Sequence, residues 1–129
     1  MKVFLVFDSE IIRRWLRMLV FHCPAAEIIG EAHDPIRALN AIRALKPDVV
    51  IMDSRNKRRL GIDVLLSMRE LKPDPKVIML TNKLYFRYEG NGAGTKADFL
   101  VDTFSERHKL PEILNACVRD GSTTVQQGC

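Results

Sequence analysis

Five short apolar runs constrain the fold most, because each is typical of a buried strand and polar or helical stretches separate them. The runs are rich in β-branched and aromatic residues and lie at Lys2–Phe7, Glu27–Ala32, Val49–Met52, Val77–Leu80 and Phe99–Val101. Short continuous runs of this kind suit strands buried on both faces. Strands that alternate with helices predict an α/β fold, a doubly wound parallel sheet covered by helices on both faces.

Helical periodicity fills most of the segments between these runs. An apolar stripe that includes Trp15 and Leu16 follows Asp8 or Ser9, either of which can cap the helix start. Asp34-Pro35 opens a second helix, whose predicted buried face is Ile36, Leu39, Ile42 and Leu45. A third helix is expected from about Gly61, and a last one near Pro111. The fourth helix, expected within residues 85–96, is predicted to be short or absent because Gly90, Gly92 and Gly94 disfavour it.

Length and composition predict one domain over residues 1–120, followed by a polar, disordered tail at residues 121–129. The chain has 129 residues, of which 47% are hydrophobic, enough for a proper core. Its net charge of +4 is too small to indicate a dedicated nucleic-acid binder. No apolar run approaches the roughly 20 residues that cross a bilayer. We therefore expect a cytoplasmic protein that does not associate with a membrane, and the composition disfavours a nucleic-acid partner. Cys23 and Cys117 are expected to be small core residues.

The residues at the strand ends carry the chemistry, because ligands of a doubly wound sheet bind outside the carboxyl ends of its strands. These residues are Asp8, Asp53, Thr81, Asp102 and Thr103. Carboxylates at neighbouring strand ends repel each other, and a hard cation such as Mg²⁺ relieves that repulsion. A hydroxyl beside them can bond to a phosphoryl oxygen, so the set is typical of a phosphoryl-accepting site. The alternative is that these residues only begin loops.

The chain resembles the receiver domain of bacterial response regulators, the CheY-like family, over about residues 2 to 119. The stretches that carry the likeness are Val6–Arg14, Lys46–Asp53, Gly61–Leu65, Lys76–Asn82 and Ala97–Leu100. The resemblance implies a flavodoxin-like strand order 2-1-3-4-5 and a phosphoprotein of two-component signalling. It implies that Asp53 accepts the phosphoryl group from a histidine kinase or phosphotransfer protein and that Thr81 bonds to it. It implies a signalling module rather than an enzyme.

Several positions depart from the family pattern. Phe7 replaces the first member of the acidic pair that binds Mg²⁺, so coordination rests on Asp8, Asp53 and the backbone carbonyl of Arg55. Mg²⁺ is therefore expected to bind weakly or not at all. Thr103 stands where the family has a phosphate-pairing Lys, or Asp102 does if the loop slips by one residue. An intact acceptor with a damaged readout is typical of a degenerate, or pseudo-, receiver.

A cluster of cations follows Asp53 at Arg55, Lys57, Arg58 and Arg59. The cluster is either a solvated loop or a source of a cation that replaces the missing Lys at the phosphate. A third interpretation joins it with Arg13, Arg14 and Arg17 into a patch for an acidic partner or nucleic acid.

Two function classes remain open. The first is a receiver in a phosphorelay that accepts a phosphoryl group on Asp53 and acts through an unknown downstream protein. The second is a constitutive interaction domain on the same fold, independent of phosphorylation. A small phosphatase using Asp8 and Asp53 is a distant third, and a homodimer is an open option for either of the first two.

Overall fold

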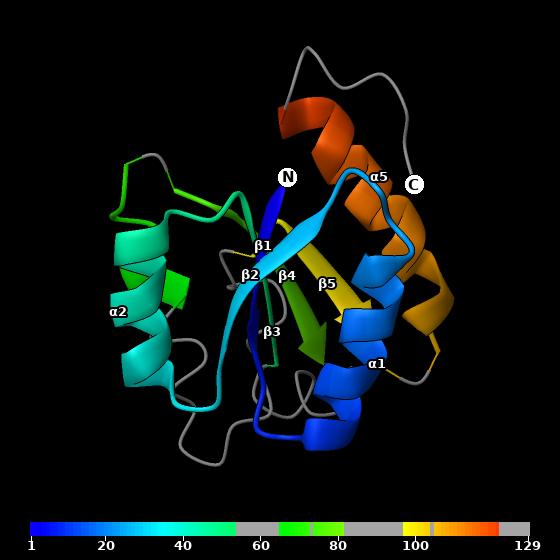
Figure 1. Ribbon diagram of the computed structural model, residues 1–129, viewed down its shortest axis with the longest axis horizontal. Helices are drawn as coiled ribbons and strands as arrows, with labels where there is room; N and C mark the ends of the chain where they lie inside the picture. The colour runs from blue at the N-terminus through cyan, green and yellow to red at the C-terminus, as the bar shows by residue number, and fades with distance from the viewer. Residues whose placement is uncertain (54–64, 73, 82–96, 104, 122–129) are drawn as a thin grey trace.

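The computed structural model describes residues 1–53, 65–72, 74–81, 97–103 and 105–121 (Figure 1). Five strands form one parallel sheet in the order β2-β1-β3-β4-β5. Their bounds are β1 Lys2–Val6, β2 Glu27–Ala32, β3 Val49–Asp53, β4 Lys76–Thr81 and β5 Phe99–Asp102. The predicted fold class and strand order are therefore confirmed, and each predicted strand is within one residue of its observed bounds.

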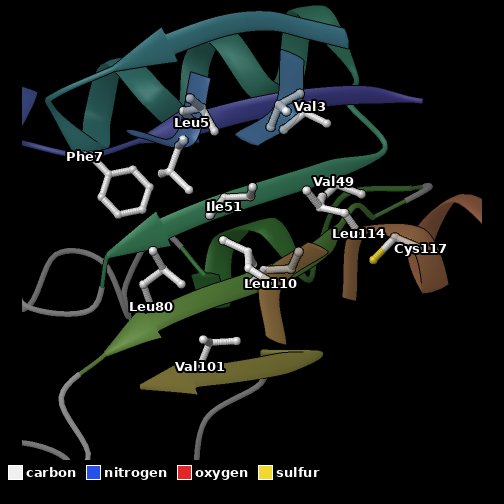
Figure 2. Packing of buried hydrophobic residues seen from close by; sticks show 13 residues of the cluster. Val3, Leu5, Phe7, Val49, Ile51, Leu80, Val101, Leu110, Leu114 and Cys117 are labelled. Atoms are coloured by element: carbon white, nitrogen blue, oxygen red, sulfur yellow. The ribbon is translucent and has the colours of Figure 1, made fainter. Parts of the chain in front are cut away.

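Helices cover both faces of the sheet and divide the core in two (Figure 1). Helices α1 (Glu10–Phe21) and α5 (Leu110–Gly121) pack on one face, and the short 3-10 helix η1 (Arg107–Lys109) precedes α5. Helix α2 (Pro35–Leu45) and the helical residues 65–68 pack on the other. Side chains alternate along each strand. Leu5 and Ile51 face α1 and α5 (Figure 2), whereas Phe4 and Val50 face α2.

The predicted caps fix where the first two helices begin. The Ser9 hydroxyl accepts a hydrogen bond from the Ile12 N–H at 3.3 Å, and the Asp34 carboxylate accepts one from the Ile36 N–H at 2.9 Å. Each cap satisfies a backbone donor that the first turn of a helix leaves without a partner. Helix α2 ends at Lys46, whose φ of 52° is left-handed. The Ser9 cap places the start of α1 at Glu10, shortly after β1 ends at Val6.

The predicted buried face of α2 is wrong at its ends. Ile36 is 67% exposed and Leu45 is 43% exposed, whereas Ala38 and Ile42 are buried. A helix turns about 100° per residue, so Ile36 lies about 200° around the axis from Ala38 and points away from the sheet. The small side chain of Ala38, which hydropathy patterning passed over, is the one that lets α2 pack on the sheet.

The core predictions for the cysteines hold, since Cys23 and Cys117 are both 2% exposed. The predicted loss of the fourth helix at 85–96 and the disordered tail fall outside the described residues, apart from Gly121, which ends α5. In the part of the chain that the structure describes, no helix is both long and apolar enough to cross a membrane.

Candidate functional site

The predicted site residues come together at one edge of the sheet. Asp53 is the last residue of β3, and Thr81 and Asp102 are the last residues of β4 and β5. Asp8 follows β1, which is paired with β3, and Thr103 follows β5. Because all five strands are parallel, their carboxyl ends share this edge. Arg55, the predicted source of a metal-binding carbonyl, and the basic cluster up to Arg59 lie outside the described residues.

Burial differs sharply among these residues. Asp8 is exposed and Asp53 is half-buried. Thr81 is 2% exposed and Thr103 is 4% exposed, so both residues are buried. The site therefore combines one exposed and one half-buried acidic residue with two buried threonines.

Phe7, which replaces an acidic residue of the family pattern, belongs to the core. It is 2% exposed and packs in the cluster that contains Leu5 and Leu80 (Figure 2). Its N–H donates to the Ala32 carbonyl at 3.0 Å. The register pairs Val6 with Met52, which aligns Phe7 with Asp53 at the same level of neighbouring strands. An aromatic ring thus occupies the place where a second carboxylate would face the acceptor.

The donor set for a metal is correspondingly small. Among the described residues, no group of three or more His, Cys, Asp and Glu side chains is placed to hold a metal ion. Asp8 and Asp53 remain, and Mg²⁺ takes one or two carboxylates together with waters. Carboxylate oxygens are suitable ligands for a hard divalent cation. Because only these two carboxylates are available among the described residues, we expect the cation to bind weakly.

Thr103 makes a different contact from the one a lysine at its position would make. Its N–H donates to the Thr81 carbonyl at 2.8 Å, and its hydroxyl donates to the same oxygen at 3.2 Å. Asp102, the alternative position for the lysine, accepts from the Ser105 N–H at 3.0 Å. Neither residue carries a positive charge, so under either alignment the phosphate-pairing lysine is absent.

Two of the arginines expected in a basic patch are instead paired with carboxylates. Arg17 donates from Nε and Nη2 to the two oxygens of Glu31, both at 2.6 Å, and from Nη1 to Glu10 at 3.2 Å. The hydrogen bond from Arg17 lowers the pKa of Glu31 below its ordinary value. Desolvation raises the pKa of Glu10, but hydrogen bonds and charge from Arg17 and Arg13 outweigh it and leave this pKa lowered.

Arg13 is buried, contrary to its expected place on a basic surface. It is 7% exposed, contacts the Glu10 carboxylate, and lies with Nη1 3.0 Å from Nε2 of His33. A guanidinium can only donate, so Nε2 of His33 would be the acceptor in a hydrogen bond with Arg13. Arg13 is buried and Arg17 is paired with Glu31 and Glu10, so these two do not supply free positive charge to the predicted patch, whereas Arg14 is exposed. The other part of that patch, Arg55 to Arg59, lies outside the described residues.

Sequence reasoning missed a contact that reaches the site from α1. The Arg107 guanidinium lies over the Trp15 ring, 5.1 Å from its centroid, and its Nε donates to the Thr103 carbonyl at 3.2 Å. No spacing rule links these residues, because the contact joins two helices across the edge of the sheet. An apolar groove of about 470 Å³ between α1 and α5 lies beside it, lined by the second half of α1, which runs away from the strand ends.

Comparison with known proteins decides the family. The family model described as "Response regulator receiver domain" matches residues 3–113. The chain belongs to the response regulator receiver family. The predicted recognition is thereby confirmed, and so is the assignment to two-component signalling.

Two curated relatives of this receiver domain are much longer than this chain. A protein-glutamate methylesterase/protein-glutamine glutaminase from Vibrio vulnificus is 38% identical over 81 residues, 63% of this chain and 24% of the relative. The transcriptional regulatory protein YdfI from Bacillus subtilis is 31% identical over 119 residues, 92% of this chain and 55% of the relative. The chain thus spans about a quarter of the methylesterase and about half of the regulator.

Solved receiver domains share the fold. The response regulator domain of Thermotoga maritima CheB superposes with a TM-score of 0.69 at 26% identity, covering 98% of each chain. The receiver domain of NarL from Mycobacterium tuberculosis gives a TM-score of 0.76 at 21% identity, covering 92% of this chain and 95% of that one.

Proposed function

We propose that this receiver domain accepts a phosphoryl group on Asp53 from a histidine kinase or phosphotransfer protein and acts through a downstream protein partner. One observation carries the proposal. In a chain of the receiver family, the half-buried Asp53 ends β3 between the ends of β1 and β4, with Thr81 on the neighbouring strand. The protein works as a cytoplasmic signalling module and turns over no substrate of its own.

Phosphoryl transfer to Asp53 requires few catalytic groups in the site. A carboxylate oxygen of Asp53 attacks phosphorus, and the bond between phosphorus and the donor atom breaks. The bonding pair leaves with the donor, which then takes up a proton. Positioning and neutralisation of charge supply most of the catalysis in such transfers. Asp8 and the carbonyl of Arg55 would hold Mg²⁺ weakly beside Asp53, and the cation supplies the neutralisation that the missing lysine does not.

The test is the intact mass of the protein after incubation with acetyl phosphate and Mg²⁺. We expect wild type to gain the mass of one phosphoryl group, and Asp53→Asn, which keeps the shape of the side chain, to gain none. Asp8→Asn is the matched second variant, because it removes the other carboxylate and leaves the acceptor. It should label more slowly than wild type and respond less to added Mg²⁺. Equal labelling of wild type and Asp53→Asn would refute the assignment of the acceptor.

The buried Phe7 favours a second candidate, a pseudo-receiver that binds a partner without phosphorylation. A core aromatic at this position lowers the number of carboxylates, and with it the affinity for the cation that transfer needs. Absence of any adduct on wild type at high donor and Mg²⁺ concentrations would support this candidate against the first. Dimerisation, open to both candidates, is measured on the same samples by light scattering.

A further inference from the structure

We infer that Thr103 is a positioning residue for Thr81, holding the end of β4 in the geometry that presents Thr81 to the phosphoryl group. The inference rests on the proposed function, because Thr81 has a task only if Asp53 is an acceptor. It assigns to Thr103, one of the two candidate positions for the family lysine, a role that differs from pairing with phosphate.

Two donors from one residue converge on one oxygen. The Thr103 N–H lies 2.8 Å and its hydroxyl 3.2 Å from the carbonyl oxygen of Thr81. The backbone bond continues the ladder one residue past the pair of Thr81 with Asp102. The hydroxyl adds a second bond from a different direction, which restricts rotation of the peptide plane that follows Thr81. This peptide plane and the side chain are both attached to the α-carbon of Thr81. The orientation of the plane therefore determines the direction of the Thr81 side chain at the end of β4.

Burial makes this contact stronger than a similar one on the surface. Thr81 and Thr103 are 2% and 4% exposed, so water does not compete for the carbonyl. A buried hydrogen bond acts in a medium of low dielectric and is electrostatically stronger than the same bond in water. Loss of the hydroxyl would leave the Thr81 carbonyl bonded to the Thr103 N–H.

Thr103 is itself held from the opposite side. The Arg107 Nε donates to the Thr103 carbonyl at 3.2 Å, and the Arg107 guanidinium lies over the Trp15 ring of α1. The neighbouring turn is tied by the Asp102 N–H, which donates to Glu106 at 3.0 Å. These contacts hold Thr103 in place from the side of η1 and α1. A residue that positions another side chain has to be held in this way.

Thr103→Val tests the inference, because valine keeps the shape and the backbone N–H and removes only the hydroxyl. The initial rate of labelling by acetyl phosphate should fall about three- to tenfold, the range that one net hydrogen bond corresponds to. Thr103→Ser should restore most of the rate. Ser105→Ala is the matched control, since it removes an exposed hydroxyl from the same loop and should leave the rate unchanged.

A second measurement does not depend on the phosphodonor. Three-bond couplings in nuclear magnetic resonance report the χ1 rotamer of Thr81, which should be single in wild type and Thr103→Ser and averaged in Thr103→Val. A wild-type rate or an unchanged Thr81 rotamer in folded Thr103→Val would overturn the inference and leave the proposed function intact. If wild type takes up no phosphoryl group, the proposed function fails and the role in transfer fails with it. The couplings alone then decide whether Thr103 positions Thr81.

Discussion

Replacement of Phe7 by aspartate should trade core stability for metal binding. The Phe7 ring is 2% exposed and packs against Leu5 and Leu80. Loss of a buried phenylalanine side chain costs about 3–5 kcal/mol of unfolding free energy. A domain of this kind has about 5–15 kcal/mol in total, so Phe7→Asp should be much less stable than wild type when Mg²⁺ is chelated.

Magnesium should reverse part of that loss. The new carboxylate would stand level with Asp53 and beside Asp8, which restores a third acidic ligand. A cation that binds only the folded state stabilises it, and 10 mM Mg²⁺ contributes about 1.4 kcal/mol if its Kd is about 1 mM. Wild type, with two carboxylates, should gain less at the same concentration.

Urea unfolding followed by the fluorescence of Trp15, the single tryptophan, measures both effects. Phe7→Ala is the matched control, because it leaves the same cavity without a carboxylate. It should lose no more stability than Phe7→Asp does in chelator, because aspartate also places a charge in the buried position, and it should gain no more from Mg²⁺ than wild type does. Wild-type stability of Phe7→Asp in chelator, or an equal response of both variants to Mg²⁺, would refute the reasoning.

Three further predictions concern stability. Pairing with Arg17 lowers the pKa of Glu31 below 4.5, so its stabilisation is complete above that pH and is lost as pH falls through the folded pKa. Arg17→Met should therefore move the acid-unfolding midpoint, followed by circular dichroism, to higher pH. Gly30→Ala places a β-carbon 2.6 Å from the buried ring of Phe4 and should cost about 1–3 kcal/mol in urea unfolding. Asp34→Ala removes the cap of α2 and should cost about 1 kcal/mol in the same assay.

The sequence was sufficient to predict the sheet, because a parallel strand that is buried on both faces is apolar at nearly every position. Each apolar run became a strand, and the polar residue after it, such as Asp8 or Thr81, lies at the edge of the sheet that holds the candidate site. Helix starts were equally visible, since Ser9 and Asp34 cap through their own side chains. These features are local, so their physical causes lie within a few neighbouring residues.

Contacts between distant segments left no such signal. Arg13 follows the pattern of a surface cation, yet it is buried against Glu10 and His33, and His33 comes from the end of another strand. The bond from the Thr103 hydroxyl to Thr81 joins residues 22 positions apart. Such pairs depend on how strands and helices are packed, which hydropathy and spacing do not encode.

The two departures at the site change its charge. In the pattern that the resemblance implies, an acidic residue stands at Phe7 and a lysine at Thr103, or at Asp102 if the loop slips by one residue. With the lysine at Thr103, Asp8 and Asp53 leave the site with the same net charge as three carboxylates balanced by a lysine. A phosphoryl group adds about −1.5 to −2 charge to the site. With no lysine at either position to meet it, Mg²⁺ or another cation, such as one from the basic cluster, has to neutralise that charge. The dependence of labelling on Mg²⁺ therefore separates a working acceptor from a pseudo-receiver more sharply than labelling alone does.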